Sequence, residues 1–136
     1  MADKMRTRAV HAGETPDPST GASSPAIAMS TTFTQDEPLG FSINAFADEK
    51  PYIYTRWGNP TVRQLETKLA ALEEAERCLA FASGMAATSA VLLSLLSAGD
   101  HLVMRNVNYP GTAELARQTL TRLGIDVTSV DTQPRE

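Results

Sequence analysis

The stretch YTRWGNPTVRQLE, from Tyr54 to Glu66, carries the most specific pattern in the chain. One residue separates Tyr54 from Arg56, and a Gly-Asn-Pro turn and a helix start follow them. Because side chains alternate along extended backbone, the sequence predicts that Tyr54 and Arg56 lie on one face of an extended segment. That face either covers a neighbouring surface or holds an anion, since the planar guanidinium of arginine pairs well with phosphate. The stretch by itself leaves both interpretations open.

The composition is close to that of an average soluble globular protein. The chain has 136 residues, of which 42% are hydrophobic and 21% charged, and this length fits one ordinary domain. A net charge of -4 argues against a general nucleic-acid or membrane-surface binder, although a local arginine can still bind a small anion. The single cysteine, Cys78, allows no internal disulfide, so a reducing, cytoplasmic setting is expected. Cys78 itself is expected to be a small buried apolar residue and not a nucleophile.

No targeting segment is predicted. The first residues lack the apolar core of a signal peptide, and the longest apolar stretch, SAVLLSLLSAG, is too short to span a bilayer. His11 and His101 lie far apart in the sequence, and no cysteine or carboxylate spacing supports a metal site. Neither membrane insertion nor metal binding is therefore expected.

Residues 1–59 are predicted to form an extended arm. Prolines recur along it, no stretch keeps a helical apolar period, and residues 26–33 (AIAMSTTF) are expected to form a short strand or extended run. Large apolar residues are nevertheless scattered through the arm: Ile27, Met29, Phe33, Phe41, Ile43, Phe46, Tyr52, Ile53, Tyr54 and Trp57. Because such residues favour burial, we expect the arm to lie on another surface, most simply that of a partner subunit. The alternative is a poorly ordered tail.

From residue 60 onward the pattern alternates between helices and strands. The first helix is predicted from a T-x-x-Q capping box formed by Thr61 and Gln64, and its apolar residues keep helical spacing to Leu72. Strands are predicted at residues 77–83, 100–105 and 126–131, and further helices at 85–96 and 112–123. This alternation indicates an α/β layer with a mainly parallel sheet. Three strands make a thin sheet, so residues 60–136 are interpreted as the opening part of a larger domain.

Three stretches could carry chemistry. In FASGMAAT, a strand ends at Ser83, and a helix start at Gly84 and Met85 exposes backbone N–H groups that suit an anion. In NVNYPGT, Tyr109 follows a strand end, where parallel sheets bind ligands, and it could stack on a flat ring. The third is Arg56. Each also has a structural explanation: a common junction glycine, a core-anchoring tyrosine and a surface arginine.

Taken together, these stretches are far more specific than any one of them. YTRWGNPTVRQLETKLAALE, AFASGMAA, GDHLV and YPGT stand in an order and spacing that resembles the N-terminal part of the Cys/Met-metabolism enzymes that use pyridoxal 5'-phosphate. The resemblance runs from about Thr7 to Asp131 and includes the arm. It implies an α/β fold, the opening part of a fold-type-I (aspartate-aminotransferase-like) large domain. The arm would occupy residues 1–59 and the incomplete cofactor-binding domain residues 60–136.

The resemblance also assigns roles to the candidate residues. Tyr54 and Arg56 match the pair that reaches across a dimer interface to the cofactor phosphate of the neighbouring subunit. The resemblance therefore favours the interpretation that these two residues hold an anion. The helix start at residues 83–85 matches the group that holds the phosphate of the chain's own cofactor. Tyr109 matches the tyrosine that stacks on the pyridine ring and assists proton transfer and leaving-group departure.

The implied activity is that of a lyase or transferase of transsulfuration. Members of the family carry out β- or γ-elimination or γ-replacement on cysteine, methionine, cystathionine or O-acyl-homoserine type substrates. The resemblance implies a cytoplasmic homotetramer, a dimer of dimers with shared active sites, with neither nucleic acid nor membrane as a partner. The residues that separate the individual reactions lie mostly beyond Glu136.

The chain departs from the family pattern at a few positions. Asn106 and Asn108 stand where acidic residues are frequent, Pro110 replaces the usual glycine after the stacking tyrosine, and Glu74 stands where a glycine is common. These departures bear on the shape of the Tyr109 loop and on substrate preference more than on cofactor binding.

The reacting groups of the family cannot be placed in this chain. Its lysines are Lys4, Lys50 and Lys68, none in the Ser/Thr-flanked setting of the Schiff-base lysine, and Lys68 is expected on the exposed side of a helix. The chain alone is therefore expected to be inactive and unstable. The alternative to a segment of a complete enzyme is a non-catalytic truncated or split subunit that pairs with a full-length homologue or a C-terminal chain. A free-standing nucleotide-binding module is disfavoured, because the Walker and G-x-G-x-x-G fingerprints are absent.

Overall fold

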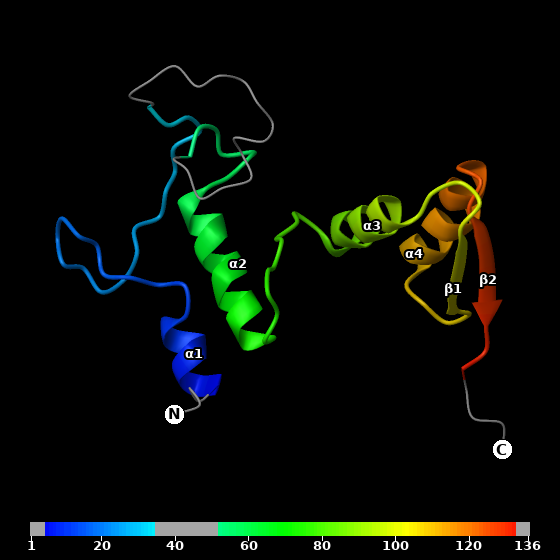
Figure 1. The fold of residues 1–136 in the computed structure, drawn as a ribbon, viewed down its shortest axis with the longest axis horizontal. Coiled ribbons are helices and arrows are strands. Elements are labelled where there is room, and N and C mark those ends of the chain that lie inside the picture. Colours follow the sequence, from blue (N-terminus) through cyan, green and yellow to red (C-terminus); the bar gives the residue numbers. More distant parts are fainter. Residues whose placement is uncertain (1–4, 35–51, 133–136) are drawn as a thin grey trace. The chain divides into compact units, whose positions relative to one another are not determined.

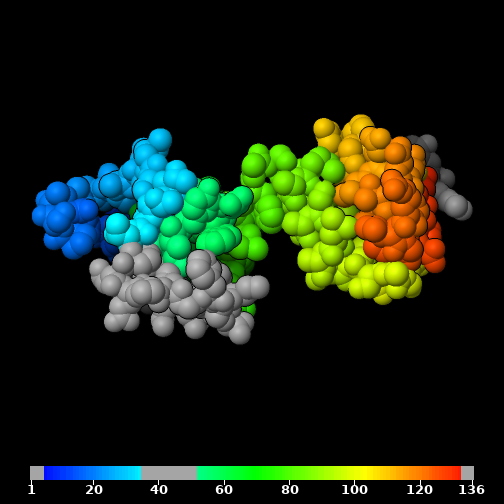
Figure 2. Space-filling model, turned by 90° about the horizontal axis from the view of Figure 1, so that it is seen from above, coloured from blue at the N-terminus to red at the C-terminus, as the bar shows by residue number. Residues whose placement is uncertain are grey.

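The computed structural model describes residues 5–34 and 52–132. The chain divides into two compact units, Met1–Ala80 and Phe81–Glu136 (Figure 1), which are described one at a time. Figure 2 shows the surface that each presents in one view. This division reflects contacts within the chain and does not test the predicted boundary between the arm, residues 1–59, and the cofactor-binding domain, residues 60–136. That boundary stays a prediction. Within the described ranges, no helix has the length and apolar character needed to cross a membrane.

The first unit is built on helix α2, Pro60–Leu72, which confirms the helix predicted there. Its start differs from the prediction: the N-cap is Asn59, whose side chain accepts hydrogen bonds from the backbone N–H groups of Thr61 (2.9 Å) and Val62 (3.4 Å). The predicted Thr61–Gln64 capping box is therefore wrong. Pro60 follows Asn59 at the first helical position, where proline fits without losing a hydrogen bond. The Thr61 hydroxyl instead accepts from the backbone N–H of Ala28 at 2.9 Å.

Asn59 also ties the arm to α2. It is 7% exposed, and its Nδ2 donates to the Ala28 carbonyl oxygen at 3.0 Å and to Thr55 Oγ1 at 2.8 Å. One buried side chain thus caps the helix and joins residues that are distant in sequence. Buried polar groups of this kind are costly to leave unpaired.

Replacing Asn59 with alanine should destabilise the first unit by about 2–3 kcal/mol, since both the cap and the buried donors are lost. Asn59→Ser keeps a capping oxygen but not the two donor contacts, so its loss should be about half as large. Denaturant unfolding of both variants, made in the protein expressed from its complete gene, checks this expectation. Equal stability of parent and Asn59→Ala would contradict it.

Next to α2, the arm begins with helix α1, Met5–His11, which the sequence did not predict (Figure 1). None of its residues is buried, and its 7 residues are too few for an apolar period to indicate a helix. Polar contacts hold the arm against α2 instead: Arg8 pairs with Glu74 at 2.8 Å, and Lys68 pairs with Glu14. The expectation that Lys68 lies on the exposed side of its helix is therefore wrong.

Gly13 lets the arm approach α2 closely. Its φ is +75°, and an added Cβ would lie 2.9 Å from the carbonyl oxygen of Gln64. A side chain is thus excluded both by conformation and by space. Further along, residues 26–33, expected to form a short strand or extended run, form no regular strand, and one isolated antiparallel bridge joins Thr32 to Tyr54.

Asp17 orders the turn between these two parts of the arm. Its carboxylate accepts from the hydroxyl and backbone N–H groups of Ser19 and Thr20. These hydrogen bonds, led by the Ser19 hydroxyl, lower the pKa of Asp17 to about 2. Because the folded pKa lies below the ordinary value, the contribution to stability is present above about pH 4 and is lost as pH falls toward 2.

The backbone at the end of α2 shows why glycine suits position 74, where this chain has glutamate. Glu74 has φ of +54°, and the N–H of Ala75 bonds to the carbonyl of Ala70 at 2.9 Å, as at a helix end with a left-handed residue. Glycine adopts this conformation without steric cost, which is a physical reason for a glycine here. This helix end is solvated, since Glu73, Glu74, Glu76 and Arg77 are exposed.

The second unit contains α3, Gly84–Leu95, the strands β1, His101–Arg105, and β2, Asp126–Val130, and a helical segment between the strands. The strands pair in parallel with His101 opposite Asp126, so both predicted strands and their direction are confirmed. The connecting segment begins as α4, Pro110–Glu114, two residues earlier than predicted, and widens into a π-helical turn, η2, Leu115–Leu120. The core consists of Ala116, Leu120 and Ile125, with Leu92, Leu96, Leu102, Met104 and Val127 packed against it.

The strand predicted at residues 77–83 is wrong for this structure. Residues 77–81 have no regular structure, and Leu79 and Phe81 are 70% and 44% exposed. A strand forms only when its backbone groups pair with a neighbour, and no strand among the described residues pairs with this segment. Cys78, expected to be buried, is half-buried.

Candidate functional site

The start of α3 offers unpaired backbone donors. Ser83 is extended (φ −155°, ψ 157°) and caps the helix, with its Oγ accepting from the N–H of Ala86 at 3.1 Å. The N–H groups of Gly84 and Met85 belong to the first turn, where an α-helix provides no acceptor. Together with the helix dipole, they form a position that favours an anion.

Gly84 leaves open space at this helix start. A Cβ built on it meets no atom within 4 Å, and its φ lies outside the left-handed region. Neither packing nor backbone conformation within the chain therefore requires a glycine. The absent side chain instead gives an external group access to the backbone N–H donors.

Tyr109 stands at the start of α4. It is the N-cap residue, with φ −59° and ψ 133°, and its side chain makes no capping hydrogen bond. The residue is 67% exposed, so most of its surface is accessible to a ligand. Met85 connects the two helix starts, because its Sδ accepts from Thr112 Oγ1 at 3.7 Å and also lies close to Gly111.

These two helix starts enclose a hollow of about 430 Å³ in the second unit. Its lining residues are Ser83, Gly84, Met85, Thr88, Tyr109 and Thr112. The structure thus brings together four residues that the sequence selected from two separate motifs. It adds two that the sequence reading missed: Thr88, one helical turn after Gly84, and Thr112, the last residue of YPGT. Both are the last residues of the quoted motifs FASGMAAT and NVNYPGT, and helical spacing from Gly84 and Tyr109 could have found them.

Tyr54 and Arg56 have a different local geometry from the one predicted. The backbone turns after Tyr54, whose carbonyl accepts from Trp57 at 2.9 Å and Gly58 at 3.1 Å, so an extended segment with both side chains on one face is wrong. The turn itself brings the two together, because the Arg56 guanidinium lies 5.0 Å from the centre of the Tyr54 ring. Arg56 is exposed. This pair belongs to the first unit.

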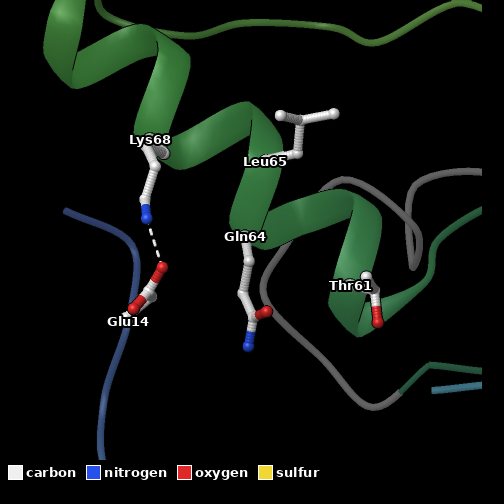
Figure 3. Close-up of a pocket in the computed structure, with 5 residues that line it drawn as sticks. All are labelled: Glu14, Thr61, Gln64, Leu65 and Lys68. Atoms are coloured by element: carbon white, nitrogen blue, oxygen red, sulfur yellow. Dashed lines mark hydrogen bonds and ion pairs between the residues drawn. The ribbon is translucent and has the colours of Figure 1, made fainter. Parts of the chain in front are cut away.

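A second hollow, of about 210 Å³, lies in the first unit beside α2 (Figure 3). Glu14 and Lys68 on its wall point toward one another, and Lys68 Nζ also donates to the Val10 carbonyl at 3.2 Å. Both charges are paired, so this hollow reflects how the arm docks on α2. Lys4 and Lys50 lie outside the described residues. In the two ranges that the structure describes, no group of three or more His, Cys, Asp or Glu could hold a metal ion.

Comparison with known proteins shows the family to which the chain belongs. The family of Cys/Met metabolism PLP-dependent enzymes matches residues 6–136, and the chain belongs to that family. Cystathionine gamma-synthase of Mycobacterium tuberculosis (strain ATCC 25618 / H37Rv) is 44% identical over 124 residues, which are 91% of this chain and 30% of the relative. L-methionine gamma-lyase of Fusobacterium nucleatum subsp. nucleatum is 43% identical over 132 residues, 97% of this chain and 33% of the relative.

Solved structures show the same relationship. The crystal structure of metB from Corynebacterium glutamicum has a TM-score of 0.85 and 41% identity, and covers 98% of this chain and 33% of its own. The predicted opening part of the fold-type-I α/β architecture is thereby confirmed. The chain spans about a third of the length of the relatives it matches.

The cofactor of the family, pyridoxal 5'-phosphate, fits the hollow beside α3. A phosphate dianion suits the free N–H groups and the dipole at the helix start, and a flat pyridine ring suits an exposed aromatic residue. Gly84 provides the access that a phosphate needs.

Proposed function

We propose that the hollow lined by residues 83–85 and Tyr109 binds pyridoxal 5'-phosphate in an enzyme of sulfur amino-acid metabolism. The observation that carries the proposal is the convergence of a free helix start, an open Gly84 and an exposed Tyr109 on one hollow in the second unit. The activity of the whole protein belongs to the proposal, since this chain spans about a third of its relatives.

Each residue has a separate role in this proposal. The N–H groups of Gly84 and Met85 bind the phosphate, and the Ser83 side chain holds the helix start in place through its bond to Ala86. The cofactor, when bound, withdraws electrons from the α-carbon of an amino acid and so permits elimination or replacement. Tyr109 orients the cofactor ring by stacking, and its hydroxyl serves to hold or pass a proton.

Tyr54 and Arg56 are proposed to act on the site of a second subunit. Arg56 is exposed and carries the fork of donors that suits a phosphate, and its guanidinium rests against the Tyr54 ring. The enzyme would then be a homodimer with shared sites, and two such dimers would form a tetramer. A cytoplasmic location and a sulfur-containing or O-acyl-homoserine substrate belong to the same proposal.

The comparisons do not choose among the reactions of the family. A synthase and a lyase are 44% and 43% identical to this chain, so similarity favours neither. We therefore propose the reaction class alone, β- or γ-elimination or γ-replacement next to a sulfur or ester leaving group.

Borohydride reduction tests the function. The protein expressed from its complete gene, reduced with borohydride and digested, should carry the cofactor on a lysine other than Lys4, Lys50 and Lys68. Lys68 is engaged by Glu14 and the Val10 carbonyl, which makes it a poor amine nucleophile. The 136-residue chain alone, treated in the same way, should retain no covalent cofactor. A complete protein that retains none would contradict the proposed function.

A further inference from the structure

We propose that Gly111 is a positioning residue for Tyr109: the absence of a side chain at position 111 leaves the space that the Tyr109 ring occupies. The inference rests on the proposed role of Tyr109 in the cofactor site. It assigns a function to a residue that does not itself line the hollow.

Gly111 is not required by backbone conformation. It lies inside α4, and it is not among the glycines with positive φ. Any residue could therefore adopt this backbone, and alanine would be preferred in a helix. The reason for a glycine must lie in what surrounds it.

The surroundings of Gly111 are the Tyr109 ring and the Met85 sulfur. A Cβ at position 111 would lie 2.9 Å from Cε1 and 3.3 Å from Cδ1 of Tyr109, and 3.1 Å from Met85 Sδ. A separation of 2.9 Å is well inside normal carbon–carbon contact, so one neighbour would have to move.

Tyr109 is the neighbour that would move. Its backbone at φ −59° and ψ 133° has the extended conformation preferred before a proline, so Pro110 restricts any backbone adjustment. Met85 is half-buried, and its Sδ is engaged by Thr112 Oγ1. Tyr109, in contrast, is 67% exposed, so its side chain has open space into which it can rotate.

A side chain at position 111 should therefore damage function without damaging the fold. A shift of about 1 Å in a positioned group can lower a rate about 100-fold. The α4 helix would keep its hydrogen bonds and would gain helix propensity from alanine.

The test compares Gly111→Ala, Tyr109→Ala and the double variant in the protein expressed from its complete gene. Turnover is measured with L-methionine or O-acetyl-L-homoserine, whichever the parent uses faster. Gly111→Ala should lower kcat about tenfold or more with unchanged thermal stability. It should have no further effect in the Tyr109→Ala background, where there is no ring to displace. A crystal structure of cofactor-free Gly111→Ala should show the Tyr109 ring rotated away from position 111.

The possible failures are distinguishable. If Tyr109→Ala leaves kcat unchanged, the proposed role of Tyr109 fails and the inference fails with it. If Tyr109→Ala lowers kcat and Gly111→Ala does not, the positioning role alone is overturned. If Gly111→Ala lowers kcat equally in the parent and in the Tyr109→Ala background, Gly111 acts through the fold. That result also overturns the positioning role. An unmoved ring in the cofactor-free variant leads to the same conclusion.

Discussion

Replacing Gly84 with alanine should weaken binding of pyridoxal 5'-phosphate by about tenfold or more. The added Cβ meets no protein atom within 4 Å, so it occupies the space through which a phosphate would reach the N–H groups of the helix start. Losing one hydrogen bond to a charged group costs about 1.5–3 kcal/mol, and 1.4 kcal/mol corresponds to tenfold in affinity. Titration of the cofactor-free protein with pyridoxal 5'-phosphate, followed by absorbance, measures the change.

The stability of the cofactor-free Gly84→Ala protein is the internal control. Alanine is a better helix former than glycine, and the new methyl group has room, so its thermal unfolding should occur at the same or a higher temperature. Weaker cofactor binding in an equally stable protein would locate the defect at the start of α3, where the phosphate is proposed to bind. Unchanged affinity would show that no phosphate contacts Gly84.

Replacing Arg56 with alanine should reduce cofactor affinity by about 10–100-fold, since a bidentate charged contact is lost. Arg56→Lys should fall between parent and alanine variant, because it keeps the charge but not the planar fork. Neither substitution should alter the fold of the first unit, since Arg56 is exposed. The same absorbance titration checks both variants.

Mixing subunits shows whether Arg56 serves its own site or that of a neighbour. In a dimer of one Arg56→Ala and one Gly84→Ala subunit, shared sites would place both defects in one site and leave the other intact. At a cofactor concentration between the dissociation constants of parent and variants, refolded mixtures should bind more cofactor than either variant alone. Binding equal to the average of the two variants would contradict a shared site.

Much of the second unit could be predicted because its elements depend on local sequence and on each other. The helix start at Gly84 and the strands at 101–105 and 126–130 follow from local sequence patterns, and the two strands pair with each other. Periodicity could not reveal the π-helical turn at Leu115–Leu120, because Ala116 and Leu120 are buried at a spacing that an ordinary helix also produces.

The errors elsewhere in the chain have separate physical origins. The strand expected at residues 77–83 depends on a partner strand. The cap of α2 is local, since Asn59 accepts from Thr61 and Val62, whereas its contact with Ala28 joins residues distant in sequence. Helix α1 is held by the ion pair of Arg8 with Glu74 and by hydrogen bonds to the Ala71 and Val10 carbonyls rather than by an apolar face, so hydrophobic spacing gave no signal. For the site, the motif residues 83–85 and Tyr109 were identifiable, whereas the contact of Gly111 with Tyr109 and Met85 becomes visible only in three dimensions.

A crystal structure of the protein from its complete gene with bound pyridoxal 5'-phosphate tests the central proposal most directly. The account predicts the phosphate within about 2.7–3.2 Å of the Gly84 and Met85 nitrogens, the pyridine ring against Tyr109, and Arg56 of the partner subunit on the same phosphate. A phosphate bound away from the start of α3 would contradict it.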